Sequence, residues 1–135
     1  MMFYIITIAV IISLGAICLV FANDENTENI NFLKNYGWTV EPNLHECETI
    51  TIPQEFDDVY NNYNELQKIS GLDLSLYKGC AAKRYTYIVT NFPHKTDDTV
   101  YANVLCVNNK PVAGDVMTVR LDGFMYSLSY LSSGK

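Results

Sequence analysis

The stretch TVYANVLCVNNKPVAGDVMTV, residues 99–119, decides the fold class because it reads as two strands joined by a tight turn. Its first half carries apolar residues at every second position, the side-chain period of a strand with one buried face. These residues are Val100, Ala102, Val104 and Cys106. Asn108-Asn109 follows, and asparagine tolerates the positive φ angles of a hairpin turn. The pattern predicts antiparallel strands over 99–107 and 111–119, with a β-bulge at Gly114-Asp115.

Three further strands are predicted upstream of this hairpin. Residues 82–91 alternate strongly, which puts one set of side chains on an inner face and leaves Arg84 and Thr86 on the other. The inner set is Tyr85, Tyr87 and Val89. Residues 48–52 also alternate, and residues 38–41 read as a short strand before a turn. We therefore expect an antiparallel sheet of about five strands.

Helical spacing predicts three helices around that sheet. Thr27 can cap a helix over residues 28–36, which Gly37 ends, with Trp38 placed to contact Leu33.

Pro53 is expected to start a longer helix that runs to Ser70 and stops at Gly71. Its predicted inner stripe is Phe56, Val59, Tyr60, Tyr63 and Leu66. Residues 73–77 look like one capped turn. Asp122 is expected to cap the last helix, whose inner side chains are Phe124, Met125, Leu128 and Leu131. The order α-β-β-α-β-β-β-α predicts an α+β domain with its helices packed on one face of the sheet.

The N-terminal segment is uncharged and long enough to cross a membrane. Residues 2–22, MFYIITIAVIISLGAICLVFA, would form a helix of about 31 Å, close to one hydrocarbon core. The flank after it is acidic, with no base before Lys34, which favours a cytoplasmic N-terminus and a domain outside. We expect residues 1–23 to anchor a single-pass protein and residues 24–135 to form one extracytoplasmic domain. The alternative is secretion after signal cleavage near Ala22.

The charge balance excludes one large class of function. The formal net charge is −6, and an acidic chain is a poor general binder of nucleic acid. The charge is unevenly divided, because residues 24–65 sum to −9 and residues 66–135 to +3. With 49% hydrophobic residues the chain is also too apolar to be disordered.

Metal, cofactor and disulfide chemistry find little support in the pattern. His45-Glu46-Cys47 is the most metal-like stretch, but the only other histidine is His94 and no Cys-x-x-Cys occurs, so we expect no metal site. Outside the N-terminal segment the cysteines are Cys47, Cys80 and Cys106, an odd number. We expect no disulfide, and Cys47 with Cys80 is the one pairing to consider. No nucleophile-elbow, zinc-protease or phosphate-loop motif is present, so no catalytic residue or cofactor is assigned.

Four charged residues are the candidate ligand-binding residues. Asp115, Arg120 and Asp122 form a compact polar group near one sheet end, which could bind a small anionic ligand or act as acid and base. Each also has an ordinary local role, as a bulge residue, a strand-end ion pair and a helix cap, and we favour these structural roles. Arg84 lies in a small basic group with Lys78 and Lys83, which could meet a partner protein or an anionic envelope polymer, although a solvated strand edge is the simpler account.

Tyrosine is frequent, with ten residues, and four of them fall on predicted inner faces. They are Tyr60, Tyr63, Tyr85 and Tyr87. A tyrosine-walled cleft is one interpretation; a packed core with its hydroxyls at the periphery is the favoured one.

Several short motifs are spread over the chain after the N-terminal segment. They are Phe32-Leu33-Lys34-Asn35-Tyr36-Gly37-Trp38, Tyr77-Lys78-Gly79, Arg84-Tyr85-Thr86-Tyr87, Ala102-Asn103-Val104-Leu105, Gly114-Asp115 and Leu121-Asp122-Gly123-Phe124-Met125. Together they resemble a family of small bacterial, membrane-anchored proteins that carry a domain of unknown function. The resemblance covers residues from about 30 to 130, and it implies an anchor followed by one domain, with no activity or substrate attached.

These observations favour a non-catalytic interaction or ligand-binding module held at the cell envelope. One alternative is a small envelope hydrolase that uses Asp115 and Asp122, or His94, as acid and base. Another is a structural subunit of a membrane complex. A hydrolase predicts that these residues converge within hydrogen-bond reach, whereas a binding module predicts an exposed apolar or aromatic patch.

Overall fold

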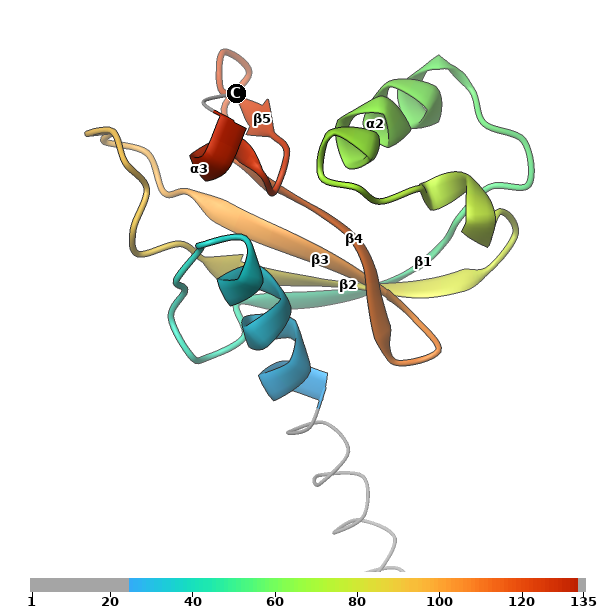
Figure 1. The fold of residues 1–135 in the computed structure, drawn as a ribbon, viewed down its shortest axis with the longest axis horizontal. Coiled ribbons are helices and arrows are strands. Elements are labelled where there is room, and N and C mark those ends of the chain that lie inside the picture. Colours follow the sequence, from blue (N-terminus) through green and yellow to red (C-terminus); the bar gives the residue numbers. More distant parts are fainter. Residues whose placement is uncertain (1–24, 134–135) are drawn as a thin grey trace, which may run out of the picture.

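The computed structural model describes residues 25–133, and their centre is a five-stranded antiparallel sheet (Figure 1). The strands follow the order β1-β2-β3-β4-β5, so each strand pairs with the next one along the chain. The α+β class and the antiparallel five-stranded sheet are confirmed. A helix over residues 25–35 comes first along the described chain. The elements that follow it are β1 Glu46–Thr51, α2 Asp58–Ile69, the 3₁₀-helix η1 Leu74–Tyr77, β2 Ala81–Ile88, β3 Tyr101–Val107, β4 Lys110–Met117, β5 Met125–Tyr126 and α3 Tyr130–Ser133.

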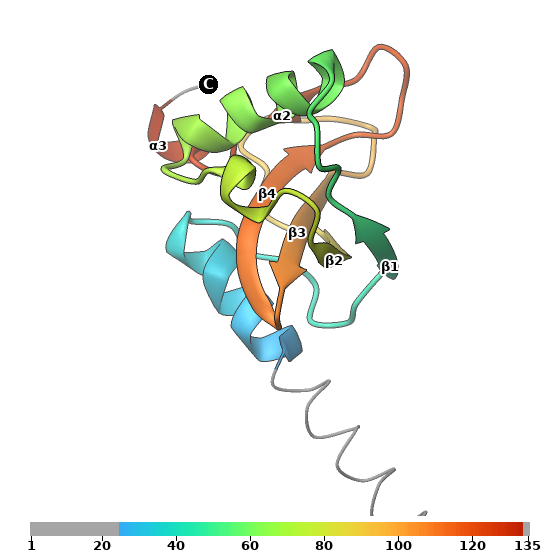
Figure 2. The same cartoon turned by 90° about the vertical axis from the view of Figure 1, so that its right-hand side faces the viewer.

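Helices cover both faces of the sheet, which corrects the prediction of a single covered face. Figures 1 and 2 place the helix over residues 25–35 on one side and α2 with η1 on the other. Because side chains alternate along β2 and β3, each strand contributes residues to two hydrophobic cores, one on each face of the sheet. Leu33 and Trp38 pack in the first core with Tyr87, whereas the second core contains Leu74 and Leu105. Residues that the alternation assigned to solvent are therefore buried beneath α2.

The β3–β4 hairpin forms as predicted, except for its bulge. Asn108 and Asn109 have φ angles of 50° and 63°. Both angles lie in the left-handed region, as a two-residue type I′ hairpin turn requires. The register shift lies nearer the turn, where Leu105 faces Ala113 and Cys106 faces Pro111, so that Val112 is the extra residue.

Gly114 is required by close packing against its neighbours, and not by a β-bulge. A Cβ at this position would lie 2.6 Å from the backbone oxygen of Asn103 and 2.9 Å from Cδ1 of Leu128. Only glycine leaves room for the neighbouring strand and for the buried Leu128 side chain.

The first described helix ends in the motif that the sequence predicts. Gly37 has a φ of 92°, its N–H donates to the Lys34 carbonyl at 2.8 Å, and the Trp38 N–H donates to the Leu33 carbonyl at 3.1 Å. These are the two hydrogen bonds of a Schellman motif. The following residues do not form the predicted strand over 38–41, because only the isolated bridge Val40↔Val89 is made.

The longer helix starts five residues later than predicted, at Asp58. Asp57 caps it by accepting a hydrogen bond from the Tyr60 N–H at 2.9 Å. Ile52 is still held against the start of β2, since its N–H donates to the Cys80 carbonyl at 2.9 Å and its carbonyl accepts from the Gly79 N–H at 2.8 Å. The chain must leave the sheet before it can begin a helix.

The predicted C-terminal helix is replaced by a turn, a short strand and a single helical turn. Met125 and Tyr126 pair with Met117 and Val116 along the open edge of β4. The rings of Phe92, Phe124, Tyr126 and Tyr130 then stack nearly parallel, with successive centroids 4.2 to 5.0 Å apart and 6.2 Å between Phe92 and Tyr130. Asp122 is therefore an exposed turn residue and not a helix cap. Strand pairing and ring stacking outweigh the helical spacing of this segment.

The predicted membrane segment, residues 2–22, lies outside the described residues. Among residues 25–133, no helix has both the length and the apolar character needed to cross a membrane.

Candidate functional site

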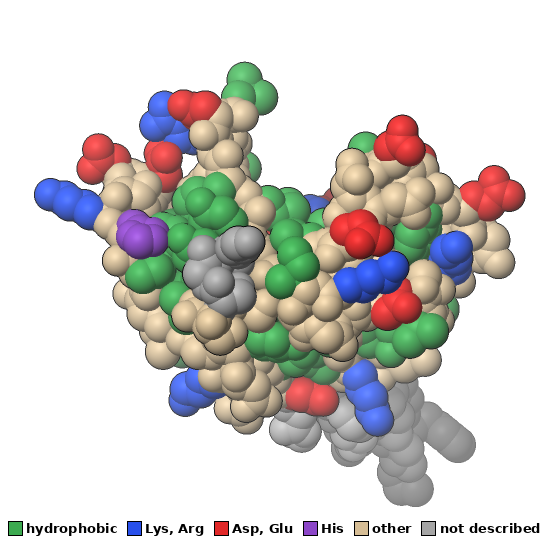
Figure 3. Space-filling view, turned by 45° about the horizontal axis from the view of Figure 1, so that its top comes forward, with side chains coloured by type: hydrophobic (Ala, Val, Ile, Leu, Met, Phe, Trp, Pro, Cys, Tyr) green, Lys and Arg blue, Asp and Glu red, His purple; other side chains and the backbone are tan. Residues whose placement is uncertain are grey.

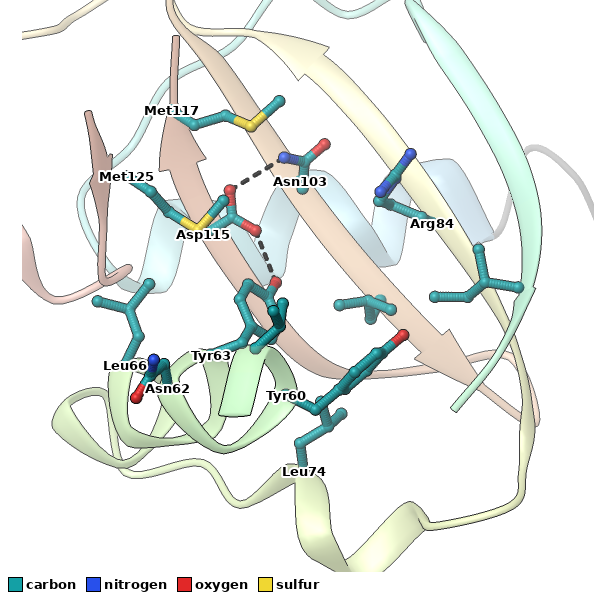
Figure 4. Close-up of a pocket in the computed structure, with 13 residues that line it drawn as sticks. Tyr60, Asn62, Tyr63, Leu66, Leu74, Arg84, Asn103, Asp115, Met117 and Met125 are labelled. Carbon is teal, nitrogen blue, oxygen red and sulfur yellow. Dashed lines mark hydrogen bonds between the residues drawn. The ribbon is translucent and has the colours of Figure 1, made fainter. Parts of the chain in front are cut away.

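A pocket of about 600 Å³ lies between α2 and the face of the sheet that α2 covers (Figure 4). The sheet forms its floor, with at least one residue from every strand, and α2 and η1 form its wall. Most lining residues are apolar. They are Ile50, Val59, Tyr60, Asn62, Tyr63, Leu66, Leu74, Arg84, Asn103, Leu105, Asp115, Met117 and Met125.

A row of hydrogen-bonded polar side chains crosses the floor of this pocket. Thr86, Asn103 and Asp115 are direct partners on β2, β3 and β4, so their side chains point to the same face. The Thr86 hydroxyl donates to Oδ1 of Asn103 at 2.7 Å, and Nδ2 of Asn103 donates to Oδ1 of Asp115 at 2.9 Å. From α2, the Tyr63 hydroxyl donates to Oδ2 of Asp115 at 2.6 Å. Strand register thus assembles a network that ends on one carboxylate.

Asp115 is a buried acid whose ionisation the surroundings oppose and support at once. Asp115 is only 2% exposed, and this burial raises the pKa of its carboxyl above the ordinary value. The hydrogen bonds from Tyr63 and Asn103, together with the charge of Arg84, act in the opposite direction. Burial and the adjacent carboxylate also raise the pKa of Tyr63 well above its ordinary value, so this hydroxyl keeps its proton and remains a donor.

Arg84 lies at the edge of the pocket and is already paired. It stands directly opposite Glu48 in the β1–β2 register, and its Nη2 donates to Oε2 of Glu48. Both side chains are about half exposed, so the pair sits in contact with solvent. Such exposed pairs contribute little to stability, about 0–1 kcal/mol.

The pocket mouth carries exposed apolar side chains. Val59 is 71% exposed and Met125 is 45% exposed. The prediction that Val59 packs inward is therefore wrong. Seen from the side on which α2 lies, hydrophobic side chains gather in a hollow between two raised parts of the surface (Figure 3). An exposed apolar patch of this kind is the feature that a binding module predicts.

Buried amides, absent from the predicted stripe, fix α2 to its neighbours. Oε1 of Gln67 accepts a hydrogen bond from the Gly114 N–H at 2.9 Å, which ties the helix to β4. Asn64 bridges to η1, since its Oδ1 accepts from the Leu74 N–H at 2.6 Å and its Nδ2 donates to Asp73 at 2.9 Å. These contacts hold the pocket wall at a set distance from its floor.

The structure separates the four predicted ligand-binding residues into two pairs. Arg84 and Asp115 both line the pocket. Arg120 and Asp122 instead lie on the exposed loop between β4 and β5. There, Nη1 of Arg120 is 3.1 Å from Oδ1 of Asp98, and its Nε is 3.4 Å from Oδ1 of Asp122. Asp115, Arg120 and Asp122 therefore do not form one site. Of the roles predicted for this group, the described residues show the ion pair after the strand end, between Arg120 and Asp122.

His94 is likewise outside the pocket. Its Nε2 lies 3.2 Å from the Tyr130 hydroxyl, and its ring meets Phe92 edge-on at a centroid distance of 5.8 Å. Among residues 25–133, no hydrogen bond joins His94 to Asp115 or Asp122. The convergence that a hydrolase would need is not formed by these residues.

The frequent tyrosines are divided between the two faces of the sheet. Tyr60 and Tyr63 line the pocket. Tyr85 and Tyr87 pack in the opposite core, and their hydroxyls donate at its edge to Glu25 and to Asn26. The cleft therefore has a partial tyrosine wall, and the core with peripheral hydroxyls also exists.

Metal and thiol chemistry have no organised site in the part of the chain that the structure describes. No three histidine, cysteine or acidic side chains there are grouped to hold a metal ion. His45 packs against the ring of Tyr101 at 5.0 Å. Cys47 is exposed, Cys80 half-buried and Cys106 buried, all as thiols. Lys78, from the predicted basic group, lies 4.9 Å above the ring of Phe56.

Sequence reasoning missed Asn103 and both pocket methionines. The positions of Asn103 and Met117 follow from period two, because Asn103 alternates with the apolar set of its strand and Met117 follows Asp115 by two residues. Met125 was expected on the inner side of a helix and lies on β5 instead. The missing information was that the second face of the sheet is covered.

Comparison with protein families matches residues 32–116, well over half of the chain, to the family described as "Domain of unknown function (DUF4830)". No curated protein matches the chain, and no solved structure matches it. The matched residues run from the first helix to β4, and so they include Tyr63, Asn103 and Asp115. The chain belongs to this family, the domain of unknown function DUF4830.

Proposed function

We propose that this domain is a non-catalytic ligand-binding module whose ligand occupies the pocket between α2 and the sheet. The observation that carries the proposal is the pocket itself, with its volume of about 600 Å³ and its buried Asp115 network. Small-molecule sites typically measure about 300–1,000 Å³ and combine an apolar lining with a few placed polar groups. A buried titratable group at such a place is a common mark of a functional site.

Binding is favoured over catalysis by what surrounds Asp115. The two side chains that bond to it, Tyr63 and Asn103, are both donors that hold the carboxylate in place. An acid–base mechanism calls for a second group of matched pKa or an activated nucleophile near the reacting atoms. Tyr63, whose pKa is raised well above its ordinary value, is a poor base or acid near neutral pH.

The proposed place of action is the outer face of the cell membrane. The uncharged residues 2–22 would anchor the chain, and the acidic flank that follows them favours export of the domain. A pocket on an anchored domain would present its ligand to an envelope polymer or a partner protein. Secretion after cleavage near Ala22 is the alternative.

Methionine methyl groups provide a direct test of ligand binding. The full chain, in lipid nanodiscs, would carry methyl-labelled methionine, so that Met117 and Met125 report on the pocket while Met1 and Met2 report on the other end of the chain. Titration with a fragment library should shift the first two signals and leave the others in place.

A matched pair of variants locates the shifts. Leu66 lines the pocket, so Leu66→Trp should fill it and abolish the shifts. Leu76 is 74% exposed and lies outside the pocket lining, so Leu76→Trp should leave them unchanged. Shifts that survive in Leu66→Trp, or a library without any ligand for the wild type, would contradict the proposed function.

A further inference from the structure

We propose that the pocket binds an organic cation, a protonated amine or other ammonium group carried on an apolar body, with Asp115 as its counter-charge. This inference rests on the proposed function, because it names the ligand class of the same pocket.

The first argument is that Asp115 is buried without a cation in contact. Among residues 25–133, no lysine, arginine or histidine nitrogen lies within 4.0 Å of its carboxylate. Arg84, the base on the pocket edge, is bonded to Glu48 instead. Buried carboxylates are normally paired with a positive charge, because desolvation of a lone ion is costly. The missing partner can come from a ligand.

The direction of the hydrogen bonds gives the second argument. Thr86 donates to Asn103, and both Asn103 and Tyr63 donate to Asp115. The network therefore ends on an acceptor. A carboxylate has about four acceptor positions, of which these two donors use one on each oxygen. The Asp115 oxygens can therefore accept further hydrogen bonds from a ligand, and an ammonium group, which has N–H donors and a positive charge, suits them best.

The surroundings of the carboxylate suit a cation with an apolar body. Met117 and Met125 lie beside Asp115, and Tyr63 reaches it from α2 (Figure 4). Aromatic faces attract ammonium groups, and the polarisable sulfur of methionine adapts to irregular ligand shapes. Beyond these side chains the lining is aliphatic, including Leu66 and Leu105, and can bury the rest of the molecule.

An anionic ligand, bound by Arg84, is the competing possibility. The anionic group of such a ligand would have to displace Glu48 from Arg84, or share the Arg84 guanidinium with it, because Glu48 lies directly opposite on the neighbouring strand. It would also enter a pocket that contains the buried carboxylate of Asp115. Both effects disfavour an anion.

Three probes that share one apolar body test the charge preference. Phenylbutylamine, phenylbutanol and phenylbutyrate would be titrated against the full chain at about pH 7, with the methyl signals of Met117 and Met125 as the readout. We expect the amine to bind at least about tenfold more tightly than the alcohol, and the carboxylate to bind most weakly.

Asp115→Asn should abolish this preference by weakening amine binding about tenfold, while alcohol binding stays within about twofold. The variant can keep the local bonds, since the asparagine oxygen accepts from Asn103 and its amide can donate to the Tyr63 oxygen. Asp122→Asn is the matched control, because Asp122 is an exposed acid on the β4–β5 loop, and it should leave both affinities unchanged.

The outcomes separate this inference from the proposed function. Equal affinities, tighter binding of the carboxylate, or a preference for the amine that persists in Asp115→Asn would overturn the cation proposal, although the pocket would still bind a ligand. Absence of binding by all three probes would also overturn it, while library ligands that shift Met117 and Met125 would leave the proposed function intact. Should Asp115→Asn fail to fold, acidification of the wild type serves instead: protonation of Asp115 should weaken the amine and spare the alcohol.

Discussion

Replacing Tyr63 with phenylalanine probes the buried network without changing the shape of the pocket. The substitution removes only the hydroxyl that donates to Oδ2 of Asp115 at 2.6 Å. Hydrogen bonds to charged groups contribute about 1.5–3 kcal/mol to stability. Since the carboxylate keeps one donor, Asn103, and the pocket can admit water, we expect a loss of about 2 kcal/mol in the free energy of unfolding. For a domain of this size that loss lowers the melting temperature by about 8 °C.

The loss should depend on pH with a definite sign. Tyr63 lowers the pKa of Asp115, so its removal raises that pKa further above the unfolded value. A carboxyl with a raised folded-state pKa binds more protons when folded, so stability falls as the pH rises from the unfolded to the folded pKa. The difference between wild type and Tyr63→Phe should therefore be full above the folded pKa of Asp115, and smaller in acid, where the carboxyl is protonated in both proteins.

Thermal and urea denaturation of the full chain measure this difference. Tyr60→Phe is the matched control, because Tyr60 lines the same pocket and its hydroxyl has no hydrogen-bond partner among residues 25–133, so its cost should stay below about 0.5 kcal/mol. In an Asp115→Asn background, the cost of Tyr63→Phe should fall to about 1 kcal/mol, the value of a neutral hydrogen bond. An equal cost in both backgrounds, or a cost no larger than that of Tyr60→Phe, would refute the reasoning.

Three further predictions concern the frame of the site and the chain end. Gly114→Ala should cost about 1–3 kcal/mol in urea denaturation, because the new Cβ would lie 2.6 Å from the Asn103 backbone oxygen; a silent substitution would show that the strands yield freely. Hydrogen bonds from Ser75 and Asn64 lower the pKa of Asp73 to about 2, so its contribution to stability is present above about pH 4 and is lost as the pH falls toward 2. The stability difference between wild type and Asp73→Asn should vanish over that interval, and a difference that persists at the acid end would contradict this assignment. Fractionation should place the full chain in the membrane with its domain digested by protease added to spheroplasts; a protected domain would reverse the proposed orientation, and a released protein that starts near Asn23 would favour cleavage.

Local sequence signals predicted the elements that depend on a few adjacent residues. The hairpin at Asn108-Asn109 and the helix end at Gly37 both require positive φ angles, which few residue types adopt. The capped turn after Asp73 follows from a side chain that bonds to a backbone two residues ahead. In each case the physical cause lies within a few residues and can be read without the fold.

The C-terminal segment shows where local signals lose to tertiary ones. Helical spacing predicted a helix after Asp122, but β4 exposes an edge that Met125 and Tyr126 complete. Rings stack along the same segment, with centroids of Tyr126 and Tyr130 4.2 Å apart. The edge becomes available only once β4 is in the sheet, and the stack also includes Phe92 from the loop before β3, so the spacing within this segment could not reveal either.

The pocket was predicted only as the less favoured interpretation, a tyrosine-walled cleft, because alternation shows that a strand has two faces without showing what covers them. Arg84 and Asp115 were candidates as individual charged residues. Their common pocket depends on the β1–β4 register and on α2, whose buried positions include Asn64 and Gln67 as well as apolar side chains. Amides on a helix read as solvent-facing from sequence, although here they fix that helix to the sheet.

The polar row beneath α2 supports the proposed binding function. Thr86, Asn103 and Asp115 occupy adjacent central strands, where three aliphatic side chains would pack without any desolvation cost. Replacing buried ionic groups by apolar ones of the same shape is often neutral or stabilising, so folding alone does not account for a carboxylate at this position. The surrounding structure nevertheless supplies two donors that hold Asp115 in one orientation and leave its remaining acceptor positions to the pocket. The proposed cation site rests on this combination: a carboxylate that folding does not require, held in a fixed geometry, beside about 600 Å³ of mostly apolar space.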